Sequence, residues 1–338
     1  MQNEITADAN LFSPDGSVEA VGWGKQPYLN YDKDYCKIPS IKLSERDCYY
    51  IHNDEMGLYL AVAVYGMTAQ ITATLINFDD GIINTSTVVK RFATGSVKMP
   101  LSSKNGDVTY ADNRIGINFA NTAVKRYLKV DFINFADGKN LYVNVAISDK
   151  NKPSINSSVD FGEKHKRNFF IKRFMPSMSV SGVIRCGGAE YNLSDENSCA
   201  YLDWSRYCTP DKTFYSALYA DGFISDKRFA ICITSGLTDN YSNIENCFFY
   251  DGSMYKISAV KMEGSEEHLD RIWKFECSQI GLKLIFEPTV VESKCMSVDC
   301  DRRSMVFGTI SGIIELGTVP IEIFEVPAHM EFTITGNK

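Results

Sequence analysis

The sequence predicts an almost entirely β protein made of two barrel-like halves, and three observations carry this prediction. Apolar and polar residues alternate along much of the chain, and turn dipeptides containing glycine recur between the alternating runs. The chain has 338 residues, which is beyond the size at which a single core usually stops growing. Two hydrophobic cores are therefore expected.

Period-two alternation is typical of strands with one buried face. It is seen in Leu58, Leu60, Val62 and Val64, in Ile71, Ala73 and Leu75, and in Leu128, Val130 and Phe132. The dipeptides between such runs predict hairpin connections. They are Asp80-Gly81, Asn105-Gly106, Asp137-Gly138, Gly187-Gly188, Asp221-Gly222 and Asp251-Gly252.

The segment 127–149, YLKVDFINFADGKNLYVNVAISD, shows the repeating unit: two alternating runs flank a turn and can pair antiparallel. Helical periodicity is weak, and the best candidate, which begins at Ser265, supports at most one short turn. Many short strands with few helices favour a sandwich or a closed barrel, because closure removes exposed strand edges.

A polar, turn-rich stretch, 148–167, predicts the junction between a domain of residues 1–166 and a domain of residues 167–338. The alternative junction is the charged loop at Asp226 and Lys227. The basic run 164–167 lies at the first junction, where a solvated linker explains it better than a binding patch.

Composition excludes several classes of function. The net charge is −7, which disfavours nucleic acid as a partner because such binding depends on clustered Lys and Arg. The N-terminus lacks a secretory pattern and no segment is long enough for a membrane span, so we expect a cytoplasmic protein.

Cysteine spacing and motif content predict neither a metal nor a cofactor. The 10 cysteines include no CxxC pair and are interpreted as buried thiols in a reducing compartment. Cys277, Cys295 and Cys300 fit no zinc spacing. The glycine-rich dinucleotide, phosphate-loop, HExxH and GxSxG motifs are all missing from the sequence.

Four segments together resemble the DUF2804 family, which is grouped with the carotenoid-hydratase and AttH-like two-lipocalin proteins. They are GWGKQPYLNYD (22–32), the run 168–193 through Met-Pro to a Gly-Gly turn, YLDWSRY (201–207), and MVFGTISGIIEL (305–316) followed by FEVPAHMEF. The sequence departs from the family pattern at Ser205, where Gly is usual, and in the wider spacing of Glu325 and His329.

The resemblance implies two tandem lipocalin-like antiparallel barrels packed together, in which the final strands can complete the first barrel. It does not supply a reaction, because relatives include a hydratase, pericyclase-like enzymes and lipid-handling proteins without catalysis. Fold alone does not determine function.

The Asp203-Trp204-Ser205-Arg206 run is the leading candidate site. In a strand, Asp203 and Ser205 face one way and Trp204 and Arg206 the other. An aspartate in an apolar barrel can stay protonated and act as a general acid, and Trp204, Tyr201 and Tyr207 can stabilise a developing cation. The alternative is structural: Asp203 and Arg206 form buried ion pairs and Trp204 fills the core.

Three further candidates lie elsewhere in the chain. Glu325 and His329, four residues apart, share a strand face and can form an acid/base pair, or they can be surface residues. Trp23 belongs to an early aromatic cluster that either binds ligand or covers a barrel end. His52 is expected in a solvated turn.

The leading hypothesis is a small, mostly apolar molecule bound in a cleft between two barrels, near Asp203 and Arg206. Chemistry there would be hydration, elimination or isomerisation without a cofactor. The first rival is a non-catalytic lipid or hydrophobic-ligand carrier. The second is a glycoside-processing enzyme that uses Asp203 and Glu190 as paired carboxylates.

Overall fold

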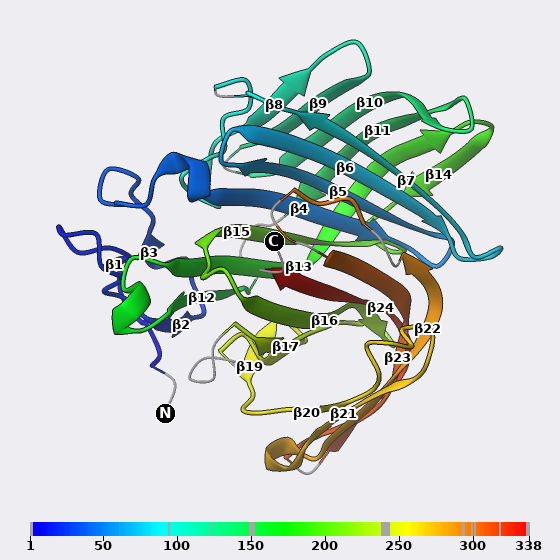
Figure 1. The fold of residues 1–338 in the computed structure, drawn as a ribbon. Coiled ribbons are helices and arrows are strands. Elements are labelled where there is room, and N and C mark those ends of the chain that lie inside the picture. Colours follow the sequence, from blue (N-terminus) through cyan, green and yellow to red (C-terminus); the bar gives the residue numbers. More distant parts are fainter. Residues whose placement is uncertain are drawn as a thin grey trace. The chain divides into compact units, whose positions relative to one another are not determined.

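The structure, a computed structural model, describes residues 3–93, 95–122, 124–148, 153–237, 244–292, 295–298, 300, 302–317 and 319–335. Over these residues it is almost wholly β, as expected, with three short 3-10 turns. The chain divides into two compact units, residues 3–208 and 209–338 (Figure 1).

The first unit contains a large curled sheet and a small parallel pair. Its strands are β1 Ala9–Asn10, β2 Gly22–Gly24, β3 Leu29–Asn30, β4 Ser44–His52, β5 Met56–Tyr65, β6 Thr68–Asn77, β7 Ile82–Lys90, β8 Val108–Ala111, β9 Ile115–Asn121, β10 Arg126–Ala136, β11 Lys139–Ser148, β12 Ile155–Asp160, β13 Phe169–Cys186, β14 Ala189–Leu193 and β15 Cys199–Cys208. The 3-10 turns η1 Ser40–Lys42 and η2 Glu163–His165 lie between them.

The order of this sheet is β7-β6-β5-β4-β15-β13-β11-β10-β9-β8, with β12 and β14 paired to β13 and β2 paired to β12. The hairpin predicted around residue 137 is confirmed: β10 and β11 pair with Val130 opposite Val143. Alternate residues of β10 are buried, so the period-two pattern does mark the core face.

Strand β13 joins the two halves of this sheet. Its first residues pair with β12 and β15, and its last residues pair with β11 and β14. A bulge between Met175 and Met178 separates the two stretches, and Ser177 there has a φ of +57°. A bulge bends a strand, and this lets one strand serve both halves.

The second unit contains a nine-stranded sheet with the order β19-β18-β17-β16-β24-β23-β22-β21-β20. The strands are β16 Thr213–Ile224, β17 Lys227–Gly236, β18 Cys247–Tyr250, β19 Ser253–Lys256, β20 Lys261–Glu263, β21 Trp273–Cys277, β22 Leu282–Glu292, β23 Arg302–Leu316 and β24 Val319–Thr335, with the 3-10 turn η3 Ser278–Ile280 after β21.

Four details differ from the sequence predictions. Asn105-Gly106 is not a hairpin connection: it lies in the segment between β7 and β8, which do not pair with each other. The expected boundary at residue 166 lies between β12 and β13, which are hydrogen-bonded neighbours within the first unit. The final strands β23 and β24 lie in the second sheet instead of completing the first. Asp221-Gly222 is not a turn: both residues lie within β16, paired with β17.

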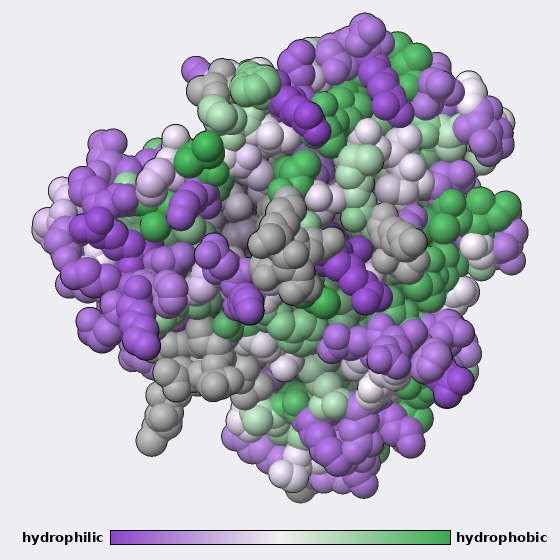
Figure 2. All heavy atoms as spheres, in the orientation of Figure 1, coloured by the Kyte–Doolittle hydropathy of each residue, from purple (hydrophilic) through white to green (hydrophobic). Residues whose placement is uncertain are grey.

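Each unit has its own apolar core, as expected. The basic run 164–167 is exposed in the connection between β12 and β13, in agreement with a solvated segment. Hydrophilic side chains gather over β1 to β3 and η2, at the left of Figure 2. No helix among the described residues is long and apolar enough to cross a membrane.

Candidate functional site

A cavity of about 370 Å³ lies within the first unit. This volume is near the lower end of the range typical of small-molecule sites, about 300–1,000 Å³. The N-terminal segments, the loop before β8 and the strands β12, β13 and β15 all contribute to it. The lining residues are Asp8, Ala9, Asn10, Pro27, Tyr28, Leu29, Asn30, Tyr31, Leu101, Ser102, Ser103, Lys104, Asn156, Ile171, Lys172, Arg173 and Trp204.

Strand β15 presents its two faces to different surroundings, as its alternation predicts. Trp204 belongs to the apolar core cluster of the first unit and also lines the cavity. Asp203 is absent from both sets of residues, and it pairs opposite Phe174 and Cys48 on the other face of the sheet. Of the predicted run 203–206, only Trp204 reaches the cavity.

Arg206 is fully buried and acts as a structural anchor. Its Nη1 donates to Asp47 Oδ1 at 2.8 Å and to the carbonyl oxygens of Arg46 and Ser205 at 3.0 and 2.8 Å. Its Nε lies 3.4 Å from Glu45 Oε1. These contacts correspond to the structural interpretation of Arg206, the alternative that the sequence left open.

The surrounding charges balance. Lys33 Nζ lies 2.6 Å from Glu45 Oε2, so Glu45 is shared between Lys33 and Arg206. Glu45 and Asp47 are both buried. The Arg206 guanidinium also lies 4.3 Å from the centre of the Trp204 ring, a cation–π geometry. Removing one member of such a network leaves a buried charge unpaired, which is strongly destabilising.

Three buried arginines hold the loop that forms one side of the cavity. Arg206 Nη2 donates to the carbonyl oxygen of Pro100 at 2.7 Å, and Arg126 Nη2 donates to that of Ser103, also at 2.7 Å. Arg173 Nη1 donates to the Ser103 hydroxyl at 3.2 Å. The loop is therefore fixed from three strands, β10, β13 and β15.

Tyr31 and Trp204 form the aromatic side of the cavity. Their rings meet edge to face, with centroids 6.3 Å apart. The Tyr31 hydroxyl and the Trp204 indole nitrogen are both buried, and neither has a hydrogen-bond partner among the described residues. An unsatisfied buried polar group costs about 1–3 kcal/mol. Burial, helped by Glu45, raises the pKa of Tyr31, so its hydroxyl keeps its proton.

Asp203 forms an ion pair with Lys172, with Oδ2 and Nζ 3.5 Å apart and both side chains buried. Lys172 lies between Ile171 and Arg173 in β13, so its side chain faces the opposite way from theirs. A neighbouring ammonium favours the ionised form of a carboxylate. This arrangement works against a protonated Asp203, and its role as general acid stays a prediction.

The other predicted aromatic residues lie away from the lining. Tyr201 is buried between Tyr50 and Phe174, with ring centroids 5.5 and 5.2 Å away. Tyr207, near the end of β15, packs on Phe170 at 5.6 Å. Trp23 is buried in β2, opposite Ser157 of β12. Their positions are those of packing residues.

The structure separates Glu190 from Asp203. Glu190 is exposed in the β13–β14 hairpin, where it pairs with Arg185, and this guanidinium lowers the pKa of Glu190. Arg185 and Phe174, which lie opposite Glu190 and Asp203 on β13, are eleven positions apart, with the bulge at Met175–Met178 between them. Paired glycosidase carboxylates are about 5–9.5 Å apart, so this placement does not favour the glycoside hypothesis for this pair.

Glu325 and His329 do not form a direct acid/base pair. Glu325 is exposed, with a φ of +47°, beside a bulge in the β23–β24 pairing. His329 is buried, with the rings of Tyr219 and Phe307 at 5.2 and 5.6 Å. Four strand residues span about 13 Å, too far for hydrogen bonding between their side chains.

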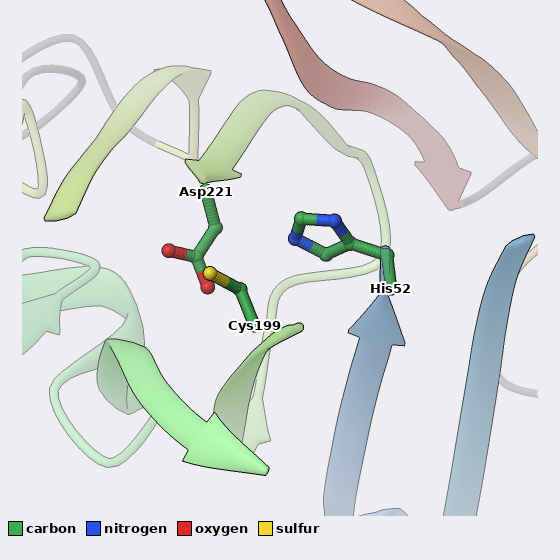
Figure 3. A group of neighbouring side chains, drawn as sticks. All are labelled: His52, Cys199 and Asp221. Carbon is green, nitrogen blue, oxygen red and sulfur yellow. The ribbon is translucent and has the colours of Figure 1, made fainter. Parts of the chain in front are cut away.

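His52 is buried, in contrast to the solvated turn expected for it. It ends β4, stacks on Tyr50 at 5.2 Å and lies directly opposite Cys199 of β15. Figure 3 shows the imidazole and the thiol on their neighbouring strands, and the ligand atoms of the two lie within 4.8 Å of each other. Asp221, also labelled there, belongs to the other unit. In the described part of the chain, Cys277, Cys295 and Cys300 belong to no group of three metal-ligand atoms.

Tyr31 belongs to the early aromatic cluster that the sequence analysis considered with Trp23, but Ser103, Lys104 and Arg173 are among the cavity residues that sequence reasoning missed. A signal was present for one: Lys172 and Arg173 interrupt the otherwise apolar run FFIKRFM. Charged residues inside a buried strand need polar partners, and this points to a polar site. The loop residues carry no such pattern, since their position depends on arginines distant in sequence.

Comparison with known proteins identifies the family. The model of DUF2804, a domain of unknown function, matches residues 2–331. The chain belongs to the DUF2804 family. A comparison with curated proteins finds no match.

Two solved structures share the fold of this DUF2804 protein, and a third has a lower similarity. CghA in complex with Sch210972 has a TM-score of 0.58 and 10% identity, and the alignment covers 98% of each chain. A candidate AttH protein from Nitrosomonas europaea has a TM-score of 0.53 and 10% identity, with 90% of this chain and 96% of that one covered. Kievitone hydratase from Nectria haematococca has a TM-score of 0.48 and 11% identity, with 87% and 89% covered.

Proposed function

We propose that this protein binds a small organic molecule in the cavity of its first unit. The single observation that carries the proposal is that the cavity combines a suitable volume with two buried hydrogen-bond donors, on Tyr31 and Trp204, that lack partners among the described residues. Buried donors are normally satisfied, and a bound molecule can supply the acceptors. CghA, which has the same fold, has been crystallised with a small molecule, Sch210972.

The reaction class that we propose is addition or elimination of water, or an isomerisation, without a redox cofactor. It rests on the resemblance to two-lipocalin hydratases. Hydration of a double bond adds a proton to one carbon and a hydroxyl group to the other, so no electrons are gained or lost overall. Acid/base groups are sufficient for this reaction in principle. Asp203, the acid predicted from the sequence, lies on the opposite face of β15 from the cavity and would act only on a molecule bound on that face.

A carrier without catalysis is the second candidate, and one observation favours it. Asp203 is not among the cavity residues, and the Tyr31 hydroxyl, whose pKa burial raises further above 10, is protonated at neutral pH and can donate a hydrogen bond. Groups of this kind bind and orient a molecule without exchanging protons.

The test is native mass spectrometry of the full chain purified from its host, followed by identification of any retained small molecule. Leu101→Trp adds bulk at an exposed residue of the cavity, and Ile133→Trp does the same at an exposed residue outside it. We expect the first variant to lose the retained molecule and the second to keep it. Equal retention by both would contradict binding in this cavity.

Asp203→Asn then separates enzyme from carrier. The protein is incubated with the identified molecule, and products are followed by chromatography and mass spectrometry. Turnover by the wild type that the variant loses, with retention unchanged, supports catalysis through Asp203. Turnover equal in both proteins excludes that role, and no turnover in either favours the carrier.

A further inference from the structure

The lining of the cavity contains two kinds of residue. Ser103, Lys104, Asn156 and Arg173 form a polar side, and Tyr31, Ile171 and Trp204 form an aromatic and apolar side. The two sides adjoin, because Arg173 of β13 pairs directly opposite Trp204 of β15. A molecule that fills such a space matches both sides only if it has an apolar body and a polar end.

The polar side carries positive charge. The Arg173 guanidinium stays protonated throughout the pH range of proteins, and its side chain is buried. Lys104 and Lys172 are the other cationic residues of the lining, Lys172 being paired with Asp203, whereas Asp8 is the only carboxylate among the lining residues. The chain as a whole has a net charge of −7. The excess of positive side chains around the cavity is therefore opposite in sign to the charge of the whole protein.

The polar side is held in place before any ligand arrives. Arg173 Nε donates to the Ser154 hydroxyl at 3.2 Å, and Asn156 Nδ2 donates to the same hydroxyl, also at 3.2 Å. Arg173 also reaches Ser103, whose loop Arg126 and Arg206 fix through backbone carbonyls. Preorganised donors lose little conformational freedom when an acceptor binds.

The aromatic side also offers donors. The Tyr31 hydroxyl and the Trp204 N–H are buried donors that add to the Asn156 amide and the cationic side chains of the lining. A group rich in lone pairs and carrying negative charge complements this set. Guanidinium in particular matches planar oxyanions such as carboxylates.

We propose that the ligand of this cavity is an anionic amphiphile, an apolar or aromatic body bearing a carboxylate, enolate or similar oxyanion. The oxyanion lies against Arg173 and Lys104, and the body lies against Trp204 and Tyr31. This inference names the ligand class and rests on the proposed function. It replaces the mostly apolar ligand expected from the sequence with one that has a charged end.

Two dyes with nearly the same apolar body test the charge. They are 8-anilino-1-naphthalenesulfonate and its uncharged counterpart N-phenyl-1-naphthylamine, each titrated into the full chain with fluorescence detection. We expect the sulfonate dye to bind at least about tenfold more tightly, because hydrogen bonds to charged groups are the stronger ones. The preference should shrink as salt is raised.

Matched lysine variants assign the preference to the cavity. Lys104 and Lys98 are both exposed, and only Lys104 lines the cavity. Lys104→Gln should reduce the preference for the sulfonate dye several-fold, and Lys98→Gln should leave it unchanged. Arg173→Gln should reduce it further, with circular dichroism showing that the variant is folded. Lys104 is a surface residue, so Lys104→Gln is expected to fold. If Arg173→Gln does not fold, the comparison of Lys104→Gln with Lys98→Gln still tests the proposal.

The outcomes separate the two proposals. Equal affinity for both dyes, lost in Leu101→Trp, overturns the anionic ligand and retains the cavity as a binding site. A preference that Lys104→Gln and Lys98→Gln alter equally also overturns it. If neither dye binds, or if Leu101→Trp binds both as the wild type does, the proposed function fails and the inference fails with it.

Discussion

Both units bury charges within their sheets, but the charges make different contacts. In the second unit, Arg303 of β23 and Glu331 of β24 form a buried ion pair, with Nε and Oε1 3.1 Å apart. In the first unit, Glu45 and Asp47 share a face of β4 with the core residue Tyr49, and Arg206 shares a face of β15 with Trp204. Arg206 also donates to the carbonyl oxygen of Pro100, so buried charges of the first unit support a cavity wall.

This difference has an energetic basis. An apolar core needs only shape complementarity, whereas each buried charge needs a partner at hydrogen-bond distance. Arg206 satisfies the requirement with two carboxylates and three backbone carbonyls. Such arrangements seldom add stability over an apolar core. In the first unit such arginines also hold the loop beside the cavity, and we interpret this contact as support for a binding site.

Removing the central charge of the first unit should have the largest effect. We expect Arg206→Met to lower the free energy of unfolding by about 3–5 kcal/mol, because Asp47 and part of Glu45 lose their counter-charge inside the core. Urea unfolding followed by circular dichroism measures the change. Lys227→Met, which breaks the exposed pair with Asp251 in the second unit, is the control and should be neutral. Equal losses of stability in the two variants would show that the buried network contributes no more to stability than an exposed ion pair.

The buried lysine of the second unit gives a pH-dependent effect of somewhat smaller size. Burial lowers the pKa of Lys256 to about 8, although its Nζ donates to the carbonyl oxygens of Asn246 and Ile257. The unfolded chain therefore binds more protons than the folded one between about pH 8 and pH 10.4. Stability should rise with pH across that window, by up to about 3 kcal/mol.

Comparison of the wild type with Lys256→Met separates the contribution of Lys256 to the pH dependence of stability from that of other groups that titrate between about pH 8 and pH 10.4. Chemical unfolding of both proteins at several pH values gives the difference in free energy, which should be largest at pH 7 and should shrink toward pH 10. A difference that stays constant with pH would contradict the lowered pKa.

Tyr31→Phe should have a small effect of the opposite sign on the first unit. Its hydroxyl is buried and has no partner among the described residues, so removing it should be neutral or should stabilise the ligand-free protein by up to about 1 kcal/mol. Thermal unfolding measures this. The same variant should bind the sulfonate dye more weakly. A clear loss of stability would indicate that the hydroxyl already has a structural partner.

Glu190→Gln should change nothing measurable in either unit. Its carboxylate pairs with Arg185 in an exposed hairpin, and exposed pairs contribute little. Unfolding curves and dye titrations of this variant should overlay those of the wild type. A loss of dye binding would show that the β13–β14 hairpin takes part in binding. It would contradict the proposal that the ligand binds in the cavity.

Local patterns predicted much of the fold. The β10–β11 hairpin follows from residues within one stretch of sequence, because alternation sets the buried face and Asp137-Gly138 sets the turn. The same reasoning was wrong for Asp221-Gly222, whose dipeptide looks identical. Pairing with β17 holds that part of β16 extended, and tertiary context overrides turn preference at this position.

The sequence by itself determined the β class, the need for two cores and the opposite facing of Asp203 and Trp204, since each depends on composition or on the period of a strand. Only the tertiary structure decided which side of β15 meets the cavity, that Arg206 is an anchor, and that Tyr31 and Arg173 lie beside Trp204. These contacts join strands and loops that are distant along the chain. Their geometry depends on sheet order and register, and neighbouring residues in the sequence do not specify either one.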